Sequence, residues 1–123
     1  MINLDDLNNS LKGLTSGPKD GRYFAKVVGA EVCRSRQDNR QVRWDIELES
    51  PDFQGYSLQK YHPIEGAQSL RYLIKDLKKF NISVSEMGNL PQILRCLTGS
   101  TIEVEIQENG DYYIVNFLRL IST

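Results

Sequence analysis

The feature that most constrains this chain is a strict alternation of apolar and charged residues. Residues 42–49 read VRWDIELE, so four apolar side chains alternate with four charged ones. Successive side chains of a β-strand point to opposite faces, and this pattern is typical of a half-buried strand. Residues 21–36 and 56–62 are rich in strand formers too, and polar turns separate the three segments. Together they predict a three-stranded meander.

The first of these segments changes its alternation at Val28 and Gly29. Before this point Tyr23, Ala25 and Val27 share one phase, and after it Ala30 and Val32 share the other. Such a change predicts a β-bulge, which bends a long first strand around a small barrel.

Helical periodicity follows the meander. Apolar residues recur at helical spacing between Leu70 and Phe80, and a shorter apolar segment spans residues 90–97. Residues 101–108 and 111–121 are then two strands joined by Asn109 and Gly110, a strong hairpin signal. A two-residue turn there pairs Glu108 with Asp111. The resulting inward pairs are Ile106 with Tyr113, Val104 with Val115, and Ile102 with Phe117.

Three strands, a helical insertion and a hairpin are the element order of the OB-fold, a five-stranded partly open barrel. We therefore expect a mainly β fold: an OB-fold domain over residues 21–123, preceded by a short N-terminal helix and linker over residues 1–20. Four leucines at helical spacing predict that helix: Leu4, Leu7, Leu11 and Leu14. A different small mixed barrel or an open sheet is the alternative.

Composition limits the function. The 123 residues suffice for one domain, and the sequence shows neither a membrane span nor a secretory signal, so we expect a cytoplasmic protein. Cys33 and Cys96 form no metal-binding motif and are expected to be buried, reduced thiols. A net charge of −1 argues against a strongly basic nucleic-acid binder, so such binding would depend on local charge.

Local charge is concentrated in one turn. Residues 34–43 contain four arginines and a single acid, Asp38. In an OB-fold this loop projects over the binding groove, where guanidinium groups pair with phosphates or stack on bases. The candidates are Arg34, Arg36, Arg40 and Arg43. A merely solvated loop is the alternative.

Aromatic side chains that point outward would supply stacking surfaces. Tyr61 is out of phase with Leu58, and Tyr112 points outward beside the hairpin, so both are candidates. Trp44 is in phase with Val42 and Ile46, which favours the core, although its position near the loop keeps it a candidate. Lys60 and His62 end the third strand and are candidates for phosphate contacts.

No catalytic or nucleotide-binding motif occurs, and we expect neither an enzyme nor a bound metal or cofactor. His62 has no serine, cysteine or carboxylate at a recognisable catalytic spacing. Asp45, Glu47 and Glu49 share one strand face and could suggest Mg²⁺, but a solvated or salt-bridged face, with Arg43 beside it, is the favoured interpretation.

Residues 21–121 resemble the OB-fold single-stranded DNA-binding proteins of bacteriophages and prophages, which serve DNA replication and recombination. The likeness is one of layout and residue type: a GRYFAKVVGAEV first strand, a basic SRQDNRQVRWDIEL turn and second strand, a FQGYSLQKYH third strand, a leucine-rich helix and a closing hairpin. The resemblance implies nucleic-acid contacts from Arg36, Arg40, Arg43, Lys60 and Tyr61, with Trp44 as a further candidate.

The leading hypothesis is therefore sequence-tolerant binding of single-stranded nucleic acid, with DNA favoured over RNA. The alternative is a protein-interaction or assembly module that uses the same barrel without nucleic acid. Ile114 and Leu118 are apolar yet expected to point outward, so either the N-terminal helix or a second copy of the chain would cover them. No membrane partner is expected.

Overall fold

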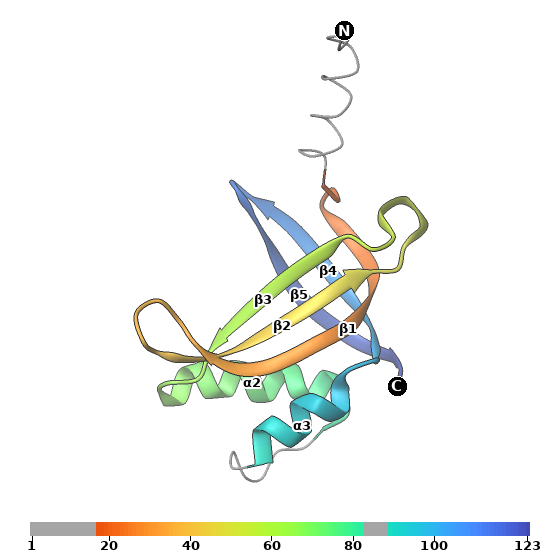
Figure 1. Cartoon of the computed structure of the whole chain (residues 1–123). Coiled ribbons are helices and arrows are strands. Elements are labelled where there is room, and N and C mark those ends of the chain that lie inside the picture. Colours follow the sequence, from red (N-terminus) through yellow and green to blue (C-terminus); the bar gives the residue numbers. More distant parts are fainter. Residues whose placement is uncertain (1–16, 83–88) are drawn as a thin grey trace, which may run out of the picture.

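The computed structural model describes residues 17–82 and 89–123 (Figure 1). The elements in chain order are β1 (Gly21–Arg34), β2 (Arg40–Leu48), the 3-10 helix η1 (Pro51–Phe53), β3 (Ser57–Pro63), α2 (Ala67–Lys79), α3 (Leu90–Leu97), β4 (Thr101–Asn109) and β5 (Tyr112–Ser122). The expected order of three strands, two helices and a hairpin is confirmed. The leucines of the expected N-terminal helix lie outside the described residues.

All five strands are antiparallel and belong to one sheet, in the order β3-β2-β1-β4-β5. In Figure 1 the meander β1–β3 crosses the β4–β5 hairpin, and α2 and α3 lie together at one end of the two layers. β3 and β5 are the two edge strands, so the described sheet is not closed into a barrel. The mainly β class is confirmed at this coarser level.

The bulge in β1 lies where the change of phase predicts it. Val27 pairs with Ile46 and Gly29 with Asp45, so Val28 has no partner on β2. Backbone hydrogen bonds join Val27 to the link between α3 and β4. The bulge therefore lets the first strand pair with β2 along its whole second half while its first half pairs with β4.

The hairpin forms as predicted, but its register is wrong by two residues. Asn109 pairs with Tyr112, and the turn consists of Gly110 and Asp111. Gly110 has φ +66°, a left-handed conformation that glycine adopts without steric cost, and Asn109 donates a side-chain hydrogen bond to Tyr112 Oη at 2.7 Å. Because strand side chains repeat every two residues, the slip of two from the turn to the pair of Val104 and Phe117 changes each partner but leaves those side chains on their predicted faces. Beyond this pair a bulge shifts the register again, and Ile102 pairs with Leu120 instead of the predicted Phe117.

The core lies between the sheet layers and the two helices. Trp44 is fully buried, with its ring stacked on Phe80 and edge-on to Phe117, at centroid distances of 5.5 and 5.0 Å. Leu73 and Leu77 add the inner face of α2. Burial of each such side chain contributes roughly 1.5–3 kcal/mol to folding.

The cysteines differ from expectation. Cys96 is exposed and Cys33 is half-buried, and both are free thiols. Cys96 lies on the outer side of α3, whose buried side carries Leu90, Leu94 and Leu97. The expected burial of both thiols is therefore wrong.

Candidate nucleic-acid interface

Three adjoining hollows run along one side of the described molecule, and Tyr61 lines all of them. The central hollow, of about 670 Å³, lies between Tyr61 and Tyr112. The arginine hollow lies at the β1–β2 loop and is lined by Arg34, Arg36 and Arg43. The seam hollow lies between the edge strands β3 and β5. We call the three together the groove.

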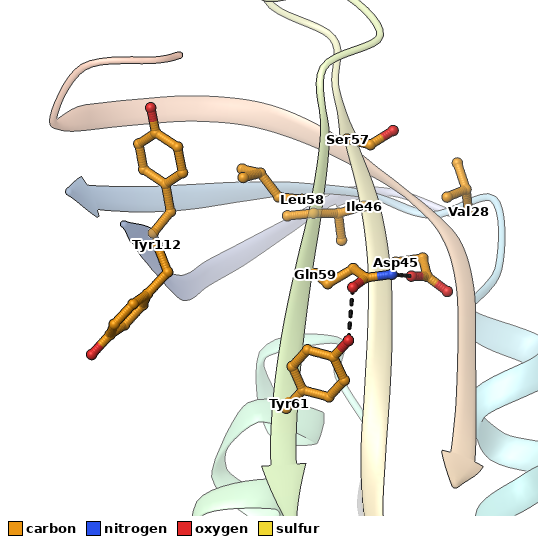
Figure 2. A pocket seen from close by; sticks show the side chains of 9 residues that line it. Val28, Asp45, Ile46, Ser57, Leu58, Gln59, Tyr61 and Tyr112 are labelled. Atoms are coloured by element: carbon orange, nitrogen blue, oxygen red, sulfur yellow. Dashed lines mark hydrogen bonds between the residues drawn. The ribbon is translucent and has the colours of Figure 1, made fainter. Parts of the chain in front are cut away.

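Two exposed tyrosines line the groove, and both point outward from the sheet as the alternation predicted. Tyr61 on β3 is 49% exposed, and Tyr112 at the start of β5 is 63% exposed. Figure 2 shows the two rings on different strands, with Gln59 and Asp45 beside Tyr61. Exposed aromatic rings facing a shared hollow can stack on flat ligands.

Tyr113 borders the same hollow but is half-buried. Its ring meets that of Tyr56 edge-on at 6.3 Å. Burial, with Tyr56 as the next cause, raises the pKa of Tyr113 to about 12, so its hydroxyl stays neutral at physiological pH. Tyr113 therefore helps to shape the hollow as a neutral side chain.

The β1–β2 loop presents its arginines unequally. Arg34 makes an ion pair with Asp38 at 3.3 Å and also donates to its carbonyl oxygen, and both side chains are exposed. Arg36 is exposed, and the described residues give it no ion-pair partner. Arg40 lines none of the three hollows, and its Nε lies 3.6 Å from Glu65 Oε1. The structure thus brings Arg34 and Arg36 to the groove and leaves Arg40 beside it.

Arg43 lies on the sheet between two carboxylates. It pairs with Glu31 on β1, and its Nε lies 3.4 Å from Asp45 Oδ2. Asp45 first, and then Glu31, raise the pKa of Arg43. Of the solvated and the salt-bridged interpretations of the acidic strand face, the ion pair supports the second for Asp45, and it leaves Arg43 partly neutralised within the groove.

Trp44 lies in the core and lines none of the three hollows. Its side chain has no exposed surface and lies between Phe80 and Phe117, so its ring cannot stack on a nucleic-acid base in this conformation. The alternation that placed it in phase with Val42 and Ile46 describes its position correctly.

Lys60 and His62 line the seam hollow, but neither is the free surface cation that a phosphate contact was expected to need. Lys60 Nζ lies 3.2 Å from Asp76 Oδ2 of α2, and it donates a hydrogen bond to Val115 O. His62 Nε2 lies 3.3 Å from the same Asp76 oxygen. Burial lowers the pKa of both Lys60 and His62, although Asp76 opposes the shift.

These three residues form a buried cluster that links β3 to α2 and β5. Asp76 is 7% exposed, and the ammonium group of Lys60 lies 4.7 Å from the centroid of the Phe117 ring. Leu58, Lys60 and His62 share one strand phase, so the alternation already placed both cations on the inner side of β3. The cluster joins the two edge strands where backbone pairing does not.

A second polar chain crosses the outer face of the meander. Tyr61 Oη donates to Gln59 Oε1 at 2.7 Å, and Gln59 Nε2 donates to Asp45 Oδ1 at 3.0 Å. Figure 2 draws both bonds. Gln59 and Val28 were not among the expected site residues. The sequence contained a signal for each of them. Gln59 has the same strand phase as Tyr61, and the change of phase at the bulge places Val28 on the outer face.

Ile114 and Leu118, which were expected to point outward beneath another element, are only partly exposed. Ile114 is 38% exposed and lines the seam hollow. Leu118 is half-buried, and a bulge in the β4–β5 pairing leaves it without a partner on β4. The N-terminal helix proposed to cover them lies outside the described residues.

No family model matches the sequence, and no curated protein matches it closely enough to be a relative. In the part of the chain that the structure describes, every helix is too short or too polar to span a membrane.

Proposed function

We propose that this chain binds single-stranded nucleic acid along the groove and that its sheet is an OB-fold with an open seam between β3 and β5. The observation that carries the proposal is the position of Tyr61, whose exposed ring borders both the central hollow and the arginine hollow. A strand lying there would stack bases on tyrosine while its phosphates reach arginine. Meander, helical insertion and hairpin supply the element order of the OB-fold.

The charges within the groove favour stacking over phosphate contacts. Arg34 and Arg43 already have carboxylate partners, which leaves Arg36 as the groove arginine without one among the described residues. Stacking on an aromatic side chain is worth about 1–3 kcal/mol per base and tolerates any base. We therefore expect modest salt dependence and sequence-tolerant binding.

The direct test is titration of fluorescently labelled oligo-dT with the full chain, followed by anisotropy at low and moderate salt. Tyr61→Ala should weaken binding by about 1–3 kcal/mol. Tyr72→Ala is the matched control, because Tyr72 on α2 is 56% exposed and lines none of the three hollows. Absence of micromolar binding at low salt, or equal losses in the two variants, contradicts the proposal.

The arginines are tested separately by salt dependence. Arg34→Ala with Arg36→Ala should reduce the slope of log affinity against log salt by about 0.7 for each phosphate that the loop no longer neutralises. Arg71→Ala with Arg95→Ala removes the same charge from the helices and should leave the slope unchanged. Equal slopes in the two double variants would show that the β1–β2 loop does not contact phosphates.

A protein-binding or assembly role is the second candidate, and Phe24 favours it. Phe24 is 46% exposed on β1 and lines none of the hollows. Ile114 adds a second exposed apolar side chain. Sedimentation velocity distinguishes the roles: a stable oligomer without affinity for oligo-dT favours assembly, whereas an oligomer that binds oligo-dT unites both.

A further inference from the structure

The groove changes the sign of its charge along its length. The arginine hollow is lined by Arg34, Arg36 and Arg43, whereas the central hollow contains the carboxylate of Asp45 and no cationic side chain among its described lining. Tyr61 borders both. A carboxylate repels phosphate, so the central hollow suits a part of the ligand other than the phosphate backbone.

The two carboxylate oxygens of Asp45 have different partners within the protein. Oδ1 accepts the hydrogen bond from Gln59 Nε2, whereas Oδ2 lies 3.4 Å from Arg43 Nε without a hydrogen bond between them. The side chain is 29% exposed. Both ends of the Gln59 amide are occupied, because its Oε1 accepts from Tyr61. Oδ2 therefore forms an ion pair with Arg43 but accepts no hydrogen bond within this network, and it can still accept one from a ligand.

The backbone opposite Asp45 keeps this oxygen accessible. Gly29 is the partner of Asp45 in the β1–β2 ladder, and a Cβ atom at Gly29 would lie 3.4 Å from Oδ2. Any longer side chain there would extend over the carboxylate. The glycine at the bulge thus leaves open space beside an acceptor, at the edge of a hollow walled by Val28, Tyr61 and Tyr112.

We propose that the central hollow is a subsite for a nucleobase with an exocyclic amino group, of which cytosine is the simplest, and that Asp45 accepts its hydrogen bond. The inference rests on the proposed function. The tyrosines and Val28 contact the flat ring, and Oδ2 accepts from the amine. Uracil presents a carbonyl oxygen where cytosine has its amine, and that oxygen is repelled by the carboxylate. The groove binds any single strand but prefers amino-bearing bases at this position.

The test compares oligo-dC with oligo-dU of equal length on the full chain. Cytosine and uracil have the same size and differ only in the hydrogen-bonding edge that they present. Oligo-dU replaces oligo-dT here because thymine carries an additional methyl group. The unmodified protein should bind oligo-dC about ten- to 150-fold more tightly, the effect of one hydrogen bond to a charged group. The readout is the ratio of the two dissociation constants, because a general change in charge alters both equally.

Asp45→Ala should reduce this ratio to about one, while affinity for both oligomers can rise as Arg43 loses a carboxylate partner. Glu47→Ala is the matched control, because Glu47 lies two residues along the same face of β2 and lines none of the hollows. The control should retain the preference for oligo-dC. Circular dichroism of both variants checks that the sheet is intact.

The outcomes separate the two proposals. Equal binding of oligo-dC and oligo-dU by the unmodified protein overturns the subsite and leaves strand binding standing. A preference that survives in Asp45→Ala, or that disappears equally in Glu47→Ala, overturns the role of Asp45. Binding of neither oligomer refutes the proposed function itself, and the subsite with it.

Discussion

Asp76→Leu removes the carboxylate of the buried cluster while keeping a side chain of similar size. Its partner Lys60 is 15% exposed at the side chain, so the variant leaves an ammonium group in a largely dry site. Removing one partner of a buried ion pair costs about 3–5 kcal/mol. Lys60 keeps its hydrogen bond to Val115 O and its position over the Phe117 ring. We therefore expect a loss of about 3 kcal/mol in the free energy of unfolding, the lower end of that range.

Urea unfolding followed by tryptophan fluorescence measures this loss, because Trp44 is the single tryptophan and is fully buried. The double variant Lys60→Met with Asp76→Leu removes both charges and should be within about 1 kcal/mol of the unmodified protein. Arg119→Ala is the surface control. It breaks a pair whose arginine is 66% exposed, and its cost should be below about 1 kcal/mol.

Two results would refute this reasoning. A loss below about 1 kcal/mol for Asp76→Leu would show that the cluster is hydrated and behaves like a surface pair. A double variant as unstable as the sum of the two single variants would show that Lys60 and Asp76 act independently.

Three further variants test other parts of the fold. Burial lowers the pKa of His62 below 6.5, so the unfolded chain takes up a proton before the folded one does, and stability falls as the pH drops below about 6.5. His62→Gln should make the unfolding free energy less dependent on pH between 7 and 5, which urea titrations at about these two values measure. Gly17→Ala would bring a Cβ atom into overlap with Tyr113 Oη and should cost about 1–3 kcal/mol in the same assay; an unchanged midpoint contradicts that packing. Gly110→Val should lower the free energy of unfolding by about 1–2 kcal/mol, because valine is strained at the positive φ of this position. If the amide protons of the hairpin stay as protected from hydrogen exchange as in the unmodified protein, the turn has changed to a type that valine tolerates.

Alternation and helical period were enough to predict the strands and α-helices of the described chain and the face on which most strand residues lie, but not the 3-10 helix η1. They located the bulge at Val28, the outward position of Tyr61 and the hairpin at Gly110. They did not determine the hairpin register, because a slip of two residues keeps every side chain on the same face and leaves the pattern unchanged.

The tertiary structure alone decided what covers each face. Lys60 and His62 are on the inner side of β3 by their phase, but their burial depends on α2, which brings Asp76 to them from another part of the chain. The sequence presented Asp45 as one of three carboxylates on a solvated or salt-bridged strand face, and the bulge at Gly29 with the ring of Tyr61 makes it part of a hollow. Local periodicity reports the direction of a side chain, whereas its burial and charge environment come from residues that only folding brings near.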